Sequence, residues 1–357
     1  MKNTKTLLSL AGVLLSAAAY AQVEVTITGS TAFRAITIDR GASLFDSGSL
    51  GAVTNDVATG LITFSGTISN AVPSLHNTPV KIRLSFSGSA AGMLAVKNQT
   101  PVSTAETQGV NVNKVPDLAL SDVFPGSATP PIAESAFDRD VLGVVPFLYV
   151  RNNGMTGVSN ITRDQAVLLM TASGTLGGFP GMPATFLGGT STSPIYMIGR
   201  DSGSGTRISV EKDIGFVGTP ILWATNGAGA YVQTNGFSSG GLERNVIAGK
   251  ADAIGYLGRA DFGAIAASAT ALSYNGVAYS PNAVLTGSYG LWGYEHIVNR
   301  AGSLSPNQGL VRDALKSAIT SPTFQGSNPL YTNSFENLNL MQVERGADGG
   351  TITSLNF

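Results

Sequence analysis

The stretch that decides the fold is Ile195-Tyr196-Met197-Ile198-Gly199-Arg200-Asp201-Ser202-Gly203-Ser204-Gly205-Thr206-Arg207-Ile208-Ser209. The first four residues are apolar, as in a buried strand, and the Gly/Ser/Thr run after them is typical of a turn that opens a helix. Free N–H groups in the first helical turn and the helix dipole attract anions, and glycine lets the backbone come close. Arg200 adds a planar, bidentate cation. Because such a site needs no catalytic group, it predicts binding before it predicts an enzyme.

Three other segments repeat this design of strand end, small hydroxylated residues and helix. Gly29–Phe33 follows the alternating strand 23–28, and Ser30 or Thr31 is the expected N-cap of the next helix. Gly88–Gly92 follows the expected strand 80–86, and Ser121-Asp122 follows the apolar residues 118–120. Ligands of open α/β sheets lie beyond the carboxyl ends of the strands. Four such ends that converge would enclose a small anion.

The remaining pattern predicts an α/β protein. Strands are expected at 141–150, 253–257 and 291–298, and helices at 162–171, 241–249 and 307–319. The segment 50–75 is rich in Gly, Thr, Ser and Asn and predicts a β-hairpin or a surface insertion.

The composition restricts the function. Of the 357 residues, 43% are hydrophobic, enough for a substantial core, and only 12% are charged, about half the usual ~25%. The net charge of −1 provides no general attraction to nucleic acid or to an anionic membrane. With no cysteine and two histidines, neither disulfides nor a metal centre is expected, and no cofactor is predicted.

The first 21 residues predict a secretory signal peptide. Lys2 and Lys5 precede a short apolar run from Leu7 to Ala19, and Ala19-Tyr20-Ala21 is a small-residue cleavage site. The mature chain would begin at Gln22. This pattern predicts export to the periplasm, with the cell surface or the extracellular space as the other destinations.

The chain resembles the periplasmic phosphate-binding proteins of ABC transporters, a branch of the type II solute-binding proteins. The motifs that carry this resemblance occur in the family's order: Ile27-Thr28-Gly29-Ser30-Thr31-Ala32-Phe33, Ser87-Gly88-Ser89-Ala90-Ala91-Gly92, Leu120-Ser121-Asp122, Arg200-Asp201-Ser202-Gly203-Ser204-Gly205-Thr206 and Ala253-Ile254-Gly255-Tyr256. The resemblance implies an α/β fold of two lobes joined by two crossover strands, with a ligand cleft between them. Lobe I would comprise 22–145 and 290–357, and lobe II 146–289.

The resemblance also implies a set of ligand-binding residues and no catalytic ones. Backbone N–H groups of the first turn and of the 204–206 turn would bind phosphate, Ser89 would add a hydroxyl, and Arg200 would pair with the anion. Asp122 would accept a hydrogen bond from a protonated phosphate oxygen. The full set is Thr31, Ala32, Phe33, Ser89, Asp122, Arg200, Ser204, Gly205 and Thr206. The implied partner is an ABC-transporter permease, and the implied state is a monomer.

Three positions depart from the family's pattern. Ala32 stands where a hydroxyl residue is usual, with Thr31 one position earlier. Ser202 stands where the family often has an aspartate, and Arg34 where it more often has proline or an aromatic residue. These departures leave the identity of the oxyanion open. Two other functions also stay open: a surface or matrix protein that kept the fold but not transport, and a hydrolase with a serine nucleophile from the Gly-Ser-Gly turn.

Overall fold

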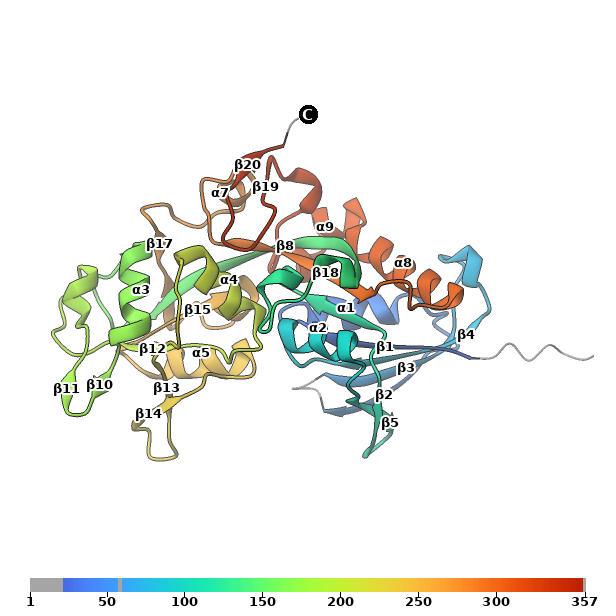
Figure 1. Ribbon diagram of the computed structural model, residues 1–357, viewed down its shortest axis with the longest axis horizontal. Helices are drawn as coiled ribbons and strands as arrows, with labels where there is room; N and C mark the ends of the chain where they lie inside the picture. Colours follow the sequence, from blue (N-terminus) through green and yellow to red (C-terminus); the bar gives the residue numbers. More distant parts are fainter. Residues whose placement is uncertain (1–21, 57–59, 356–357) are drawn as a thin grey trace, which may run out of the picture.

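The computed structural model describes residues 22–56 and 60–355, which form two lobes side by side (Figure 1). The predicted signal peptide lies outside the described residues. One mixed sheet runs through both lobes, with the strand order β12-β15-β8-β18-β7-β1-β4-β3-β2 and with β16 also paired to β8. The expected two-lobed α/β fold is therefore present.

Strand β1 (Val23–Gly29) is the middle of the first lobe's sheet. It pairs in parallel with β4 (Pro79–Ser85) on one side and with β7 (Leu118–Ser121) on the other. Its residues are almost all buried, because helices α2 (Ser89–Asn98) and α8 (Pro306–Thr320) pack against it. Since the three strands are parallel, their carboxyl ends lie at one edge of the sheet. The turns that follow them begin at that edge.

The segment 50–75 is a hairpin that extends this sheet rather than an appended insertion. Strands β2 (Gly51–Asp56) and β3 (Leu61–Thr67) pair antiparallel, and β3 pairs antiparallel with β4. A second hairpin, β5 (Val102–Thr107) and β6 (Val110–Lys114), packs beside it, and the Thr63 hydroxyl donates to the carbonyl of Ala105 at 2.5 Å.

Strand β8 (Phe137–Asn152) carries the chain from one lobe to the other. Its first part pairs with β18 (Trp292–Arg300), from Phe137 up to Pro146, and β18 is inserted between β8 and β7. Its last residues, from Phe147, pair instead with β15 (Ala253–Gly258) and β16 (Ala269–Ala271). The lobe boundary expected at residue 146 falls where β8 changes its partner, and it stays a prediction. After the strands of the second lobe, the chain passes through α7 (Pro281–Leu285) and a loop into β18.

The second lobe is built around β15, which pairs in parallel with β12 (Tyr196–Ile198). The segment 219–240 contains one hairpin, β13 (Leu222–Thr225) with β14 (Tyr231–Thr234). Short pairs complete the strands: β9 (Asn160–Ile161) with β17 (Ser273–Tyr274), β10 (Thr175–Leu176) with β11 (Phe179–Pro180), and β19 (Val343–Glu344) with β20 (Thr353–Ser354).

The bounds of the main helices are α1 (Arg34–Ala42), α2 (Ser89–Asn98), α3 (Arg163–Ala172), α4 (Gly205–Ile214), α5 (Gly240–Gly249), α6 (Arg259–Gly263), α8 (Pro306–Thr320), α9 (Pro322–Ser327) and α10 (Pro329–Thr332). Hydroxyl caps open α3, α4, α5, α7 and α8, whereas α1, α2, α6 and α9 begin without a side-chain cap. Thr162 and Ser305 each form a capping box, so α3 begins at Arg163 and α8 at Pro306.

The two lobes share apolar packing where α2 faces α4 near the centre of the molecule (Figure 1). Ile208 of α4 belongs to a buried cluster whose other members lie in lobe I, among them Met93 and Ala90 of α2 and Val298 of β18. Burial of such side chains stabilises by about 25 cal/mol per Å² of apolar surface. Helix α4 is therefore held against the other lobe by apolar contact as well as by the polar contacts described next.

Candidate functional site

The first turn of α4 is shaped by two local side-chain bonds. Asp201 Oδ1 accepts from the backbone N–H of Gly203 at 3.1 Å, which closes the turn after β12. Ser204 is the N-cap of α4, and its hydroxyl accepts from the N–H of Arg207 at 3.4 Å. The predicted strand, turn and helix start are thus all present, and the helix begins at Gly205.

Ser89, Asp122, Gly205 and Thr206 lie together at the contact between the lobes. The Ser89 hydroxyl donates to Asp122 Oδ1 at 2.5 Å, and the Thr206 hydroxyl donates to Asp122 Oδ2 at 3.4 Å. A Cβ atom on Gly205 would lie 2.8 Å from Asp122 Cγ and closer still to Ser89 Oγ. The Asp122 carboxyl group therefore sits at the amino end of α4, where a negative charge is stabilised by the helix.

The same contact continues along α2. The backbone N–H of Ala90 donates to the carbonyl of Gly203 at 3.2 Å. Gly88 has φ +97°, and a Cβ atom on it would lie 2.8 Å from that same carbonyl oxygen. Only glycine combines this backbone conformation with so close an approach, so the small residues of both turns allow the lobes to meet.

Arg200 is almost fully buried and is held by oxygen acceptors. Its Nε donates to the Phe237 carbonyl at 3.0 Å, and its Nη2 donates to the Ser238 carbonyl at 3.0 Å and to Thr31 Oγ1 at 3.2 Å. No described carboxylate lies within ion-pair distance of it. Arg200 does not pair with Asp201, and it reaches across to the first turn of the other lobe through Thr31.

The turn after β1 places Thr31, Ala32 and Phe33 differently from the cap expected there. Helix α1 begins at Arg34, its N-cap is Phe33, and no side chain caps it. The prediction of Ser30 or Thr31 as N-cap is wrong, because residues 31–33 form bends and the helix begins only after them. Ser30 Oγ accepts from the Phe33 N–H at 3.3 Å, a capping-type bond that closes this turn instead of the first turn of the helix. The Phe33 ring is buried edge-on against Phe335, with centroids 4.7 Å apart.

The described residues group the predicted site into two contacts rather than one. Ser89, Asp122, Gly205 and Thr206 form the first, and Arg200 with Thr31 forms the second. No hydrogen bond among the described residues links Arg200 to Asp122. Ser204 caps α4, whose first turn belongs to the first contact. Ala32 and Phe33 follow Thr31 in the turn after β1.

Buried acids surround these contacts. Burial raises the pKa of Glu295 well above its usual range, and the charge of Asp122 raises it further. Burial likewise raises the pKa of Glu243, and the positive charge of Arg200 lowers it. Burial raises the pKa of Asp261 also, while Arg244 lowers it through a 2.8 Å ion pair. Glu243 and Asp261 both act on the charge of Arg200, so buried acids as well as carbonyl oxygens surround this cation.

Two cavities between the lobes flank the first turn. One of about 400 Å³ is lined by Thr31, Arg34 and Ser87 on one side and by Ser238, Ser239 and Arg244 on the other. The other, of about 160 Å³, is lined by Thr31, Ala32, Arg34 and residues of α6. Thr31 and Arg34 thus line both cavities, and Ala32 lines the smaller one.

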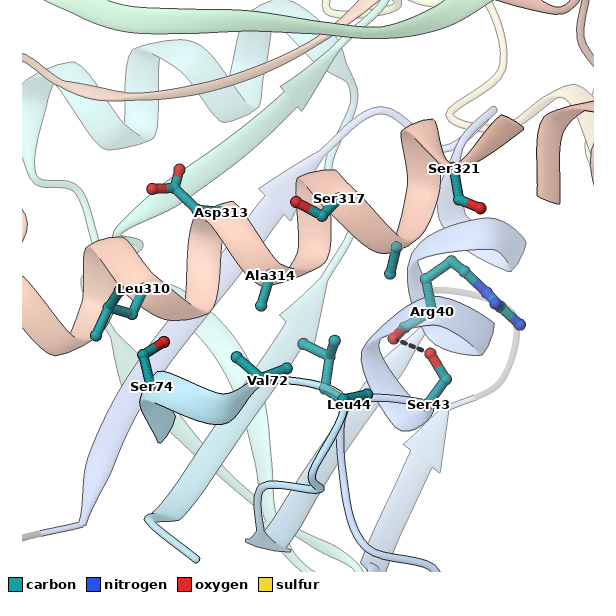
Figure 2. Close-up of a pocket in the computed structure, with 12 residues that line it drawn as sticks. Arg40, Ser43, Leu44, Val72, Ser74, Leu310, Asp313, Ala314, Ser317 and Ser321 are labelled. Atoms are coloured by element: carbon teal, nitrogen blue, oxygen red, sulfur yellow. Dashed lines mark hydrogen bonds between the residues drawn. The ribbon is translucent and has the colours of Figure 1, made fainter. Parts of the chain in front are cut away.

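A larger cavity of about 600 Å³ lies within lobe I, between α1, the turn at 73–75 and α8 (Figure 2). Figure 2 shows Leu310 and Ala314 of α8 opposite Val72 and Leu44, with Arg40 and Asp313 at its borders. None of the predicted site residues lines it.

Sequence reasoning missed several residues of the site. Tyr256, whose hydroxyl accepts from the Arg200 N–H at 3.3 Å, does fall within a motif of the resemblance. Glu295 had a signal as well, since it is the lone acid of the strand 292–300. Glu243 had none, because an acid in the first turn of a helix is usually a favourable surface charge.

Two further properties bear on the function. Within residues 22–56 and 60–355, no three His, Asp or Glu side chains are placed to hold a metal ion. In the same part of the chain, every helix is too short or too polar to cross a bilayer.

The chain matches known proteins in structure but not in sequence. No model of a protein family and no curated protein matches the chain. It is similar to a protein described as a phosphate ABC transporter substrate-binding protein, solved with bound phosphate, from Clostridium perfringens: 16% identity, TM-score 0.56, covering 88% of this chain and 99% of that one.

Two other solved structures give the same result. An ABC-type phosphate transport receptor from Vibrio cholerae matches at 18% identity and TM-score 0.50, covering 85% of this chain and 98% of that one. The high affinity periplasmic phosphate-binding protein PfluDING matches at 13% identity and TM-score 0.51, covering 88% and 91%. At these identities the similarity establishes the fold, and at that level it confirms the predicted resemblance.

Proposed function

We propose that the chain is an exported solute-binding protein that captures inorganic phosphate, or a similar tetrahedral oxyanion, between its lobes and delivers it to an ABC-transporter permease. It acts as a monomer and makes or breaks no covalent bond. The ligand-binding residues are those predicted from the sequence, from Thr31 to Thr206. Lobe closure by a hinge motion holds the anion.

The observation that carries this proposal is the meeting of the lobes at the amino end of α4. Ser89 and Asp122 come from lobe I and Gly205 and Thr206 from lobe II, so the contact forms only when the lobes approach each other. The buried Arg200 supplies the cation near the first turn. Structures similar in fold are described as phosphate-binding, which supports the same ligand class.

Asp122 provides a reason for phosphate rather than sulfate. Hydrogen phosphate has a proton to donate to a carboxylate oxygen, whereas sulfate at neutral pH has none. A sulfate oxygen facing Asp122 would be an unsatisfied contact between like charges, which costs more than an absent hydrogen bond.

The hydrolase alternative loses support from the positions of the two histidines. His296 is fully buried, with Nδ1 3.0 Å from Arg139 Nη1, and His76 is exposed beside Asn77. Neither is hydrogen-bonded to Ser204, whose hydroxyl is engaged in the helix cap. A serine nucleophile there would have no base.

Isothermal titration of the purified chain with phosphate, arsenate and sulfate tests the proposal. We expect phosphate and arsenate to bind and sulfate to bind much more weakly. At a hundred times its dissociation constant, phosphate should also raise the free energy of unfolding by about 2.7 kcal/mol. A surface protein that lost the site would show no binding, and thermal melting that responds to another solute but not to millimolar phosphate would refute the proposal.

A further inference from the structure

The cavity of about 400 Å³ between the lobes adjoins the proposed phosphate site directly. Thr31 lines this cavity and also accepts from Arg200 Nη2, and Ser238, whose carbonyl accepts from the same nitrogen, lines it from the other lobe. One wall of the cavity is therefore the hydrogen-bonded surroundings of Arg200. A group attached to an anion at Arg200 would extend into this space.

The polar lining of the cavity consists largely of donors. Arg34 and Arg244 line it from opposite lobes, together with the hydroxyl residues Thr31, Ser87, Ser238 and Ser239. Ser239 is also the N-cap of α5, and its hydroxyl accepts from the Leu242 N–H at 3.3 Å, so the amino end of that helix borders the cavity. Arginines and hydroxyls suit a ligand whose surface is made of acceptor oxygens.

The charges around the cavity favour an anion over a neutral polar group. Arg34, Arg200 and Arg244 are close enough to repel one another, and the negative groups that act on Arg34 are Asp261 and Asp56. Asp261 already pairs with Arg244 at 2.8 Å. Glu243 acts on Arg200 in the same way. The cavity itself, however, is lined by Arg34 and Arg244 and by no described carboxylate, so a ligand that enters it meets positive charge.

We propose that this cavity receives a second phosphoryl group, covalently joined to the phosphate held near Asp122 and Arg200, so that the preferred ligand is a condensed phosphate such as diphosphate. The inference rests on the proposed function, because the first phosphoryl group occupies the site proposed there. Arg34 and Arg244 bind the second phosphoryl group, and the α5 cap and the cavity hydroxyls add hydrogen bonds.

Titration with three probes tests this inference: inorganic phosphate, diphosphate and glycerol 3-phosphate. Diphosphate should bind at least about tenfold more tightly than phosphate, the gain expected from one hydrogen bond between charged groups. Glycerol 3-phosphate fills the cavity without a second anionic group, so it should bind no more tightly than phosphate.

Variants locate the effect in the cavity. Arg34→Gln and Arg244→Gln should each weaken diphosphate by about tenfold and change phosphate by much less. Leu242→Glu adds a negative charge at an exposed position that lines the cavity and removes no buried contact. It should likewise weaken diphosphate more than phosphate. Arg300→Gln, at the exposed end of β18, is the matched loss of a positive charge elsewhere and should alter neither ligand.

The outcomes separate this inference from the proposed function. Binding of phosphate without a preference for diphosphate overturns the inference alone, as does a preference that all three cavity variants leave unchanged. Glycerol 3-phosphate that binds as tightly as diphosphate also overturns it, because the cavity would then select bulk rather than charge. Failure of both phosphate and diphosphate to bind overturns the two proposals together.

Discussion

Substitution of Gly205 by alanine perturbs the contact between the lobes at a single carbon atom. The added Cβ would lie 2.8 Å from Asp122 Cγ and nearer still to Ser89 Oγ. Both neighbours are buried, and their side chains are tied together at 2.5 Å. The added atom can therefore be accommodated only if α4 and the α2 turn move apart.

The expected magnitude follows from two opposing terms. Insertion of a methyl group into a tightly packed region costs about 1–3 kcal/mol. Alanine in place of glycine favours a helix by about 0.5–1 kcal/mol. With the middle of each range, the net cost to the closed arrangement is about 1.25 kcal/mol, so phosphate affinity should fall by about eightfold. The free energy of unfolding without ligand should change little, because the lobes can separate and relieve the clash.

The assay is isothermal titration with phosphate for the parent and the variant, together with chemical denaturation of each without ligand. Gly309→Ala in α8 is the matched control, since a Cβ atom at Gly309 would meet no atom within 4 Å. It should gain a little stability and keep full affinity. A Gly205→Ala protein that binds phosphate as tightly as the parent would refute the argument that closure at this point holds the ligand.

Three further predictions follow from the same structure. Arg200→Ala should weaken phosphate by about 2–5 kcal/mol in titration, because the anion loses its buried counter-charge; an unchanged affinity would place the anion elsewhere. Asp122→Asn should narrow the preference for phosphate over sulfate, mostly by improved sulfate binding in a competition titration at one ionic strength, and a parent protein with no such preference would contradict this. Burial raises the pKa of Asp348 from 3.8 to about 6, so its neutral form stabilises the fold fully below pH 4, and that contribution of about 3 kcal/mol is lost as the pH rises to 6. Asp348→Asn should remove this part of the pH dependence in denaturant unfolding between pH 4 and 7, and parallel curves for parent and variant would show that another group is responsible.

Most of the fold could be predicted because its signals are local. Thr162 and Gln165 form the capping box that opens α3, and Ser204 caps α4 as a hydroxyl residue before a helix should. The alternation of 23–28 gave β1 within one residue of its observed end. In each case the neighbouring residues alone decide the conformation.

The rest depends on contacts between residues far apart in sequence. Ser30 makes the i to i+3 bond of a capping serine to the Phe33 N–H, yet α1 begins only at Arg34, and the Phe33 ring packs on Phe335, which lies far away in sequence. The carbonyls of Phe237 and Ser238 hold Arg200, and a backbone carbonyl leaves no mark in the residue pattern. Motif order could predict which residues belong to the site but not that they would form two separate contacts.

The position of β18 in the sheet has a consequence for synthesis. Strand β18 lies between β8 and β7, yet it follows β1 by about 270 residues in the chain. At roughly 5–20 residues per second, ribosomes need roughly 14 to 54 seconds to make that interval. Until β18 emerges, β7 and the first part of β8 lack the strand that joins them, so the sheet that links the lobes cannot be completed. The sheet that links the lobes is therefore completed only late in synthesis, which would keep the chain open for the export that we propose.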